Sequence, residues 1–170
     1  INFDNGLKVD FKIILGEYFG VKSNEPLPHS WAKNPNNHLG IATIKMDPDT
    51  SFTLPAISKS LNRYLFLYES DEFVNVDSEK LYPQEIAFLA GDEEIVVKNG
   101  KKIANLLILE GEPIDEPVAA YGPFVMNTQE ELQVAFAEYR ETEFGGWPWG
   151  NTEQDAVNPK HEGRFASYNF

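Results

Sequence analysis

The amino-acid sequence predicts a mainly β protein, a sandwich or barrel of short strands, with one helix near its C-terminus. Between residues 39 and 109, short runs of strand-forming residues follow one another and are separated by turn residues. Many short strands with no helix between them are typical of all-β sandwiches and barrels. One later segment, residues 129–140, has apolar residues at helical spacing instead.

The first predicted strand covers residues 7–13, where apolar and polar residues alternate as they do in a half-buried strand. The apolar positions are Leu7, Val9, Phe11 and Ile13. Residues 24–38 are rich in Pro, Asn and Ser and are predicted to form a loop. Further strands are predicted at residues 39–46, 51–54, 63–68, 73–76, 86–89, 95–98 and 103–109.

Two turn motifs connect predicted strands. Asp47, Pro48 and Asp49 are interpreted as a turn after the strand at residues 39–46. Asn99 and Gly100 are typical of a type I′ turn, which predicts a hairpin between the last two strands. Closing such a sheet into a barrel would hide strand edges that otherwise promote aggregation.

Residues 106–128 lead from the last strand into the helix. Pro113 and Pro117 lie in an acidic loop, so this part cannot form a regular strand inside a sheet. Thr128 and Glu131 have the spacing of a capping box, which predicts the start of the helix. One face of the helix is apolar and carries Leu132, Ala135, Phe136 and Tyr139.

The composition excludes several classes of protein. A formal net charge of -13 argues against nucleic acids and anionic membranes as partners, because both would repel the chain. The absence of cysteine excludes disulfides, thiolate zinc sites and a cysteine nucleophile. The sequence has no apolar run of membrane-spanning length and no signal-peptide pattern, and we expect a cytoplasmic protein. Because the chain begins at Ile1 without an initiator Met, we expect a piece of a longer protein.

Residues 111–128 contain three motifs in succession, Gly-Glu-Pro-Ile, Glu-Pro-Val and Gly-Pro-Phe-Val-Met-Asn-Thr. In this order they resemble the C-terminal domain of the pirin family, a branch of the cupins. Gly-Glu-Tyr-Phe-Gly-Val-Lys-Ser at residues 16–23 resembles the start of that domain. Gly-Gly-Trp-Pro-Trp at residues 145–149, with a later Arg-Phe-Ala, resembles its end in one bacterial branch.

The resemblance implies a cupin-type fold, a double-stranded β-helix or jelly-roll barrel with one C-terminal helix and an irregular aromatic tail. It also implies a division of the chain. We expect residues 1–23 to be a leading strand and linker from a missing N-terminal domain. Residues 24–127 would then form the barrel, and residues 128–170 would be a helix and tail that pack on it.

The histidines bear on metal binding. A metal-binding cupin typically holds its ion with two or three His and a carboxylate from neighbouring strands. This chain has only His29, His38 and His161, so the predicted barrel from Leu39 onward has none. The resemblance implies iron or another divalent metal in the N-terminal cupin domain. We therefore predict no metal, no cofactor and no catalytic residue in this chain, the alternative being that the three histidines gather from loop and tail.

Acidic residues could also form a site. They cluster at two places, Glu69, Asp71 and Glu72 in one and Asp92, Glu93 and Glu94 in the other. Both clusters are interpreted as solvated turn residues, with an all-carboxylate site as the alternative. Asp115 and Glu116, just before Pro117, are interpreted as part of a structural corner and not as catalytic acids.

Tyr64, Phe66 and Tyr68 lie on one face of the strand predicted at residues 63–68. This face either lines a ligand pocket inside the barrel or belongs to ordinary barrel packing. A hollow interior would favour a third kind of function, a small-molecule binding module.

Phe144, Trp147 and Trp149 form an aromatic group in a glycine-containing segment. They either contact a partner or fold back on their own barrel. The partner that the resemblance implies is the missing N-terminal cupin domain of the same protein. Without that domain, apolar surface would be exposed, and a homodimer through the vacated face is a further prediction.

The predicted function is that of the C-terminal cupin domain of a pirin-like protein, non-catalytic by itself. The resemblance associates the intact parent with quercetin 2,3-dioxygenase-like activity that depends on iron or another divalent metal, and with regulatory protein contacts. This chain would support, cover or shape the metal domain, or present a partner surface. The alternative is a stand-alone cupin that binds a small molecule or a metal through a non-standard site.

Overall fold

The computed structural model describes residues 1–2 and 6–143. The chain divides into two compact units at the boundary between Ile114 and Asp115. Among the described residues, no helix combines the length and the apolar character that a membrane span requires.

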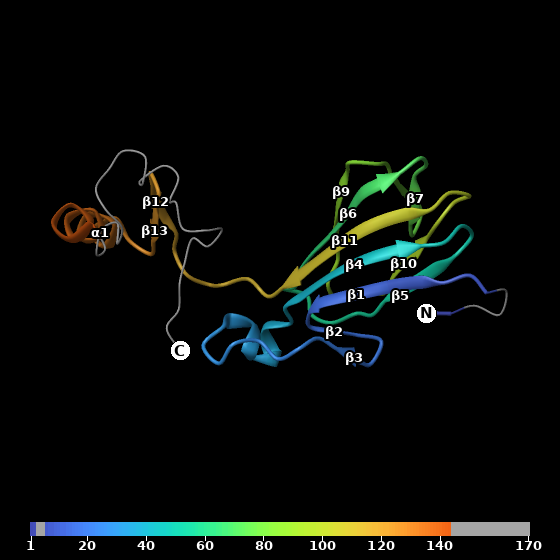
Figure 1. Ribbon diagram of the computed structural model, residues 1–170, viewed down its shortest axis with the longest axis horizontal. Helices are drawn as coiled ribbons and strands as arrows, with labels where there is room; N and C mark the ends of the chain where they lie inside the picture. Colours follow the sequence, from blue (N-terminus) through green and yellow to red (C-terminus); the bar gives the residue numbers. More distant parts are fainter. Residues whose placement is uncertain (3–5, 144–170) are drawn as a thin grey trace, which may run out of the picture. The chain divides into compact units, whose positions relative to one another are not determined.

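The first unit is built on an antiparallel five-stranded sheet with the strand order β1-β4-β11-β6-β9 (Figure 1). Its strands are β1 (Val9–Leu15), β4 (Gly40–Met46), β6 (Asn62–Ser70), β9 (Ile86–Leu89) and β11 (Ala104–Gly111). The central strand β11 pairs with β4 on one side and with β6 on the other. Five strands that lie far apart in the sequence therefore share one sheet.

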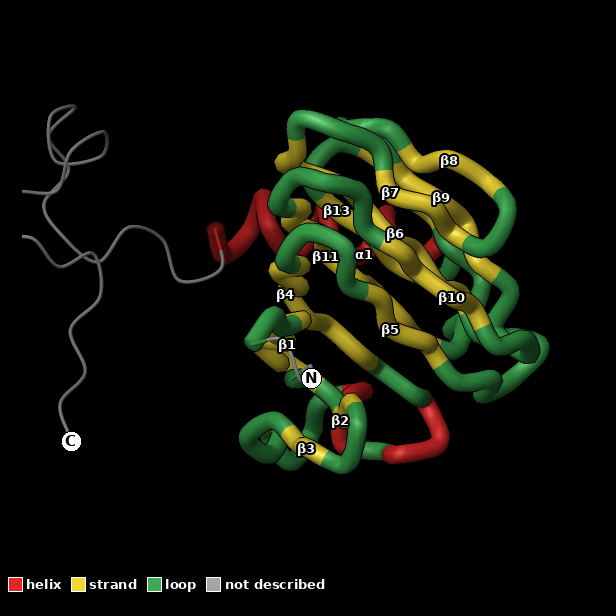
Figure 2. Tube along the Cα trace, turned by 90° about the vertical axis from the view of Figure 1, so that its right-hand side faces the viewer, coloured by secondary structure: helices red, strands yellow, loops and turns green. Residues whose placement is uncertain are grey.

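A four-stranded sheet faces the first one and has the order β5-β10-β7-β8 (Figure 2). Its strands are β5 (Ser51–Leu54), β7 (Val74–Val76), β8 (Glu79–Leu81) and β10 (Ile95–Lys98). A ribbon of β2 (Glu17–Tyr18) and β3 (Val21–Lys22) lies beside the β1 edge of the large sheet, together with the 3-10 helices η1 (Trp31–Lys33) and η2 (Pro35–Asn37). The ribbon, β8 and the short helices were not predicted from the sequence.

The two sheets bury one apolar core between them. Ile44, Leu65 and Leu106 come from the large sheet, Leu54 and Val97 come from the small one, and each is at most 1% exposed. These side chains belong to a single cluster, which is the packing of a β-sandwich. The predicted mainly β architecture is confirmed. The closed barrel needs correction, because in the described part of the chain the two sheets are separate hydrogen-bonded ladders.

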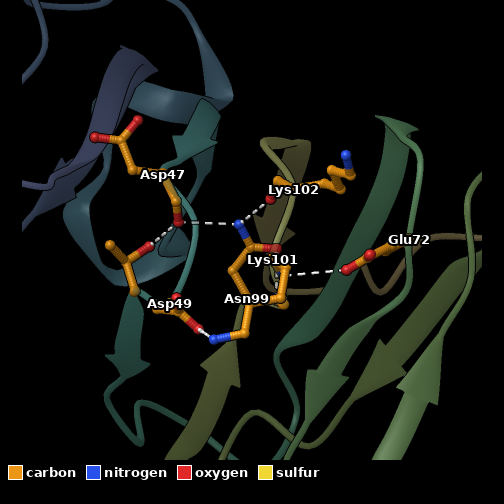
Figure 3. A network of polar contacts seen from close by, with 8 residues as sticks. Asp47, Asp49, Glu72, Asn99, Lys101 and Lys102 are labelled. Atoms are coloured by element: carbon orange, nitrogen blue, oxygen red, sulfur yellow. Dashed lines mark hydrogen bonds and ion pairs between the residues drawn. The ribbon is translucent and has the colours of Figure 1, made fainter.

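The predicted hairpin at Asn99 and Gly100 is wrong. β10 pairs with strands of the small sheet and β11 with strands of the large one, so the connection crosses between sheets. Neither residue has the positive φ that a type I′ turn requires. Instead, the Asn99 amide nitrogen donates to the carbonyl oxygens of Asp47 and Lys102, at 3.0 and 2.7 Å (Figure 3). It also donates to the Met46 carbonyl oxygen at 3.2 Å. Asn99 thus fixes the corner where the chain changes sheets.

The second unit contains a hairpin of β12 (Ala119–Tyr121) and β13 (Phe124–Met126), followed by the helix α1 (Gln129–Thr142). The predicted capping box is confirmed, because the Thr128 hydroxyl accepts from the Glu131 N–H and the Glu131 carboxylate accepts from the Thr128 N–H. The Phe136 ring packs edge-on against Phe124, with ring centroids 4.8 Å apart. The helix therefore holds the hairpin through its apolar face. The packing of helix and tail on the barrel stays a prediction.

Candidate functional site

The predicted ligand-lining rings of β6 do not point into the sandwich. Leu65 and Leu67 are fully buried in the core, whereas Tyr64, Phe66 and Tyr68 lie on the opposite face and are half-buried. A pocket inside the barrel at these rings is therefore wrong. Both faces of β6 are apolar, so alternation alone could not tell which side faces the core. A role of these three residues in ligand binding stays a prediction.

The outward side of the large sheet is apolar across four neighbouring strands. We call it the outer apolar face, and it comprises Ile41, Tyr64, Phe66, Ile86, Phe88, Leu107 and Leu109. In one row across the sheet, Leu109 lies opposite Tyr64, and Tyr64 lies opposite Phe88. Phe88 is 77% exposed and Ile86 is 53% exposed. The outward face of an antiparallel sheet is ordinarily polar, so this face is a candidate contact surface.

On the inward side, Arg63 of β6 and Glu110 of β11 are register partners. The Arg63 Nε donates to Glu110 Oε1 at 2.5 Å, and the two side chains are 0% and 5% exposed. The Tyr18 hydroxyl donates to Glu110 Oε2 at 3.1 Å. A Cβ at Gly40 would collide with this hydroxyl, so the glycine makes room for the contact. Both carboxylate oxygens of Glu110 are thus engaged.

Burial determines the electrostatics of this group. Desolvation, followed by the Glu110 charge and hydrogen bond, raises the pKa of the Tyr18 hydroxyl far above its ordinary value. Tyr18 is therefore a neutral donor throughout the neutral range. Breaking a buried ion pair by removing one partner costs roughly 3–5 kcal/mol, because the other charge is left uncompensated. Arg63, Glu110 and Tyr18 consequently form one interdependent unit.

A second polar group lies around Glu112, two residues further along the chain. Its Oε1 contacts His38 Nδ1 at 3.0 Å, and its Oε2 accepts from the Ser60 hydroxyl at 2.6 Å. The Ser60 hydroxyl, with smaller contributions from Ser58 and His38, lowers the pKa of Glu112 below its ordinary value. The group joins the long loop before β4 to the loop before β6, and Glu112 is the central acceptor.

Two adjoining pockets open at this end of the first unit. One has a volume of about 340 Å³ and is lined by Tyr18, Arg63 and Glu110 among others. The other has a volume of about 460 Å³ and extends along the loop that contains His38. They share Glu17, Ile57 and Glu110 as lining residues. Pockets of this size suit small molecules.

The donor set does not fit a metal ion of the cupin type. Apart from Arg63 and Glu110, the inward strand positions that form the core are apolar, and Glu110 already has Arg63 as its counter-ion and Tyr18 as a donor. Within residues 1–2 and 6–143, no group of three or more His, Asp or Glu could hold a metal. His29 is exposed in the loop, and His38 contacts Glu112.

The remaining predicted residues are separate from these pockets. Glu69 accepts from the Asn105 amide at the end of β6. Glu116 accepts from the Asn127 amide at 2.8 Å, a contact of the corner before α1. Most of the two acidic clusters is solvent-exposed, namely Glu69, Asp71, Asp92, Glu93 and Glu94. Phe144, Trp147, Trp149 and His161 lie outside the described residues, so the partner contact stays a prediction.

The sequence and the fold of this chain are similar to those of known proteins. The sequence model of the family described as the pirin C-terminal cupin domain matches residues 41–145. The chain belongs to the pirin family. The resemblance read from the motifs around residues 111–128 is thereby confirmed.

Several pirins show the extent of the match. Human pirin is 30% identical over 140 residues, which are 81% of this chain and 45% of that protein. Pirin-1 of Arabidopsis thaliana is 31% identical over 146 residues, 84% of this chain and 47% of that protein. The chain thus spans about half the length of the curated relatives it matches.

Solved structures confirm the cupin-type fold. The crystal structure of a quercetin 2,3-dioxygenase from Acinetobacter baumannii matches with a TM-score of 0.64 at 26% identity. The match covers 79% of this chain and 43% of that one.

The Arg63–Glu110–Tyr18 group was missed by the sequence analysis of this pirin domain, although two signals were available. Arg63 is in phase with Leu65 and Leu67, so a charge on the leucine side of the strand indicates a buried ion pair. The second signal is Glu110, the counter-ion of Arg63. It lies two residues before Glu112, so the two carboxylates are expected on the same side of an extended chain. The contribution of Tyr18 has no such signal, because it depends on how the β2–β3 ribbon folds.

Proposed function

We propose that this chain is the non-catalytic cupin domain of a pirin-like protein and that it supports a separate, N-terminal metal-binding cupin. The observation that carries the proposal is the state of Glu110. Each of its two oxygens already accepts a hydrogen bond, one from Arg63 and one from Tyr18, and the inward carboxylate is neutralised by an internal cation, which disfavours a second cation at the same place. The apolar core positions on the inward side, which offer no metal ligands, favour the same interpretation.

Quercetin 2,3-dioxygenase-like activity would then belong to the metal-binding domain, with iron or another divalent metal as its cofactor. A structural relative with that name supports the reaction class for the intact parent. A regulatory protein contact is the second role that a non-catalytic domain can have. In both cases this chain contributes surface rather than chemistry.

We assign the contact with the metal-binding domain to the outer apolar face. None of the residues that make up this face is charged, which suits packing against another sheet. The curated relatives are about twice as long as the matched part, so they contain a second stretch of comparable size. Pairing with an identical chain is opposed by the net charge of -13 on each copy.

Elemental analysis tests the proposal directly. The purified chain is dialysed against buffer without chelator, and its metal content and its oxygen uptake with quercetin and added Fe²⁺ are measured. We expect metal well below one equivalent and no turnover, with a metal-loaded quercetin 2,3-dioxygenase as the positive control. A stoichiometric transition metal would overturn the proposal, and His29, His38 and His161 would then be the first residues to substitute.

The alternative, a stand-alone cupin that binds a small molecule, is favoured by one observation. The pocket of about 340 Å³ has a size that suits small molecules and is lined by both apolar and charged residues, among them Phe19, Ile57 and Glu94. The two functions are compatible, because the pocket and the outer apolar face lie on opposite sides of the large sheet.

A further inference from the structure

His38 belongs both to the polar group around Glu112 and to the pocket of about 460 Å³. Its side chain is 39% exposed, and the ring contacts Glu112 through Nδ1 at 3.0 Å. The other ring nitrogen, Nε2, lies at a different edge of the imidazole and has no hydrogen bond to a described residue. His38 lines the pocket, whereas Glu112 does not. Nε2 is therefore the ring nitrogen that a ligand in the pocket can reach.

The contact with Glu112 determines which ring nitrogen of His38 carries the proton. The pKa of Glu112 is lowered, chiefly by the Ser60 hydroxyl, so its carboxylate is ionised at neutral pH and can only accept. Nδ1 must then be the protonated nitrogen. In the neutral imidazole, Nε2 is consequently a hydrogen-bond acceptor.

Backbone hydrogen bonds hold this acceptor in place. His38 ends η2 in the left-handed conformation, with a φ of 45°, and its N–H donates to the Pro35 carbonyl at 3.1 Å. The Glu112 N–H donates to the Asn37 carbonyl at 2.9 Å, and the Asn37 amide donates to the Trp31 carbonyl at 2.7 Å. The ring and its carboxylate partner are thus fixed before a ligand arrives, which lowers the entropic cost of binding.

Asn34 is a second polar residue of the pocket wall. Its Oδ1 accepts from the Asn36 N–H at 3.0 Å at the start of η2, whereas its amide nitrogen has no hydrogen bond to a described residue. Asn34 precedes the short helix and His38 follows it, so one element positions both groups. A hydroxyl can donate to Nε2 and accept from the amide, a combination that an N–H group cannot provide.

The charged residues that line the pocket are already paired. Lys22 lies 3.4 Å from Glu17, and Lys33 lies 2.7 Å from Glu25. Glu110 is neutralised by its buried ion pair. An ionic ligand of either sign would therefore add an uncompensated charge, which favours an uncharged one.

We propose that this pocket binds a small uncharged alcohol. The hydroxyl donates to His38 Nε2 and accepts from the Asn34 amide nitrogen, and the apolar body packs against Leu15, Leu39 and Ile57. A volume of about 460 Å³ accommodates an alcohol that contains a single ring. This binding site goes beyond the supporting role proposed for the chain and does not depend on it.

Three probes of similar shape test the proposal on the intact chain. Benzyl alcohol, benzyl methyl ether and toluene are titrated separately into ¹⁵N-labelled protein at pH 8, where imidazole groups are ordinarily neutral. The His38 Nε2 signal and the amide signals of Leu15 and Leu39 are followed by NMR. We expect saturable shifts with benzyl alcohol. The ether, which cannot donate, should bind roughly tenfold more weakly, and toluene, which can neither donate nor accept, should bind more weakly still.

Matched variants separate the hydroxyl contact from folding. Asn tolerates the left-handed conformation and can donate to Glu112, so His38→Asn should stay folded, as judged by its melting temperature. It should bind benzyl alcohol roughly tenfold more weakly. Asn34→Asp keeps the oxygen that caps η2 and removes the donor, so it should also weaken alcohol binding. His29→Asn, in the same loop but outside the pocket, should leave all three affinities unchanged.

Three results would each overturn the proposal. The absence of saturable shifts with benzyl alcohol would mean that the pocket does not bind alcohols. Equal affinities for the alcohol and the ether would mean that the hydroxyl does not donate, and unchanged affinity of the folded His38→Asn variant would mean that Nε2 is not the acceptor. The supporting role is tested separately by the metal content of the chain, so the two proposals can fail independently.

Discussion

Arg63 on β6 and Glu110 on β11 are direct cross-strand partners, and their side chains meet inside the sandwich with Nε 2.5 Å from Oε1. Each charge is buried, so each is stable there only because the other is present. An internal cation therefore lies next to an inward carboxylate at this end of the first unit. This relationship leads to the first two predictions.

Replacing Glu110 by Ala should lower the free energy of unfolding by about 3–5 kcal/mol, because Arg63 is left buried and unpaired. Urea denaturation followed by tryptophan fluorescence measures the change. Asp10→Ala is the control, since its ion pair with Lys8 is exposed and should contribute almost nothing. Equal stability of Glu110→Ala and the original chain would mean that the guanidinium is solvated.

Gly40→Ala should lower the free energy of unfolding by about 1–3 kcal/mol, because the added Cβ displaces the Tyr18 hydroxyl from Glu110. Gly111→Ala is a matched control, since its Cβ would lie 3.5 Å from Leu39, an ordinary contact. Thermal unfolding compares the two variants. A similar loss in both variants would show that the collision with the Tyr18 hydroxyl does not decide the effect.

The contacts of Glu112 predict a pH-dependent contribution to stability. Its pKa in the folded chain is lowered from 4.5, chiefly by the Ser60 hydroxyl, so the contacts stabilise the fold above about pH 4.5. That contribution is lost as the pH falls through the lowered pKa. Ser60→Ala should therefore be less stable than the original chain at pH 7, and the difference should shrink below pH 4.

Chemical denaturation between pH 7 and pH 3 measures this difference. Ser23→Ala is the control, because the Ser23 hydroxyl donates to a neighbouring carbonyl in an exposed loop and not to a carboxylate. A Ser60→Ala difference that is constant down to pH 3 would show that Ser60 does not act through the ionised form of Glu112.

The outer apolar face predicts self-association of the chain when no other domain covers it. Light scattering should show a mass above that of the monomer at high protein concentration. The association should increase with salt, because screening weakens the repulsion between copies of charge -13. Phe88→Ser with Ile86→Thr should restore the monomer without loss of stability, since both side chains are more than half exposed.

Leu65→Ser is the contrasting variant, because it places a polar group in the core and should unfold the chain. A monodisperse monomer of the original chain at every salt concentration would contradict the prediction. It would also weaken the assignment of this face as a contact surface.

The strands were the part of the fold that the sequence predicted well. Those at residues 51–54, 86–89 and 95–98 have the predicted bounds, and the capping box of α1 is present as expected. These features depend on local alternation and on spacing within a few residues. Local signals of this kind do not require knowledge of the packing around them.

The predictions were wrong where a local sequence pattern was compatible with two different structures. Both faces of β6 carry large apolar side chains, so alternation did not show which face points into the core. The inward face is the one that also carries the charged Arg63, which a sequence pattern would ordinarily place outside. Asn99 and Gly100 have the composition of a hairpin turn, but the Asn99 amide donates to the distant carbonyls of Met46 and Asp47 as well as to the nearby carbonyl of Lys102. In both cases the deciding interactions join segments that are far apart in the sequence.

The Arg63–Glu110 pair also has a consequence for how the sequence can change over time. The two positions are 47 residues apart, yet substitution of either one alone passes through a chain with a buried unpaired charge. A substitution at one of the two positions is therefore expected to be tolerated only if the other position changes as well. Descendants of this chain should retain both charges or lose both, so that the codons for residues 63 and 110 change together.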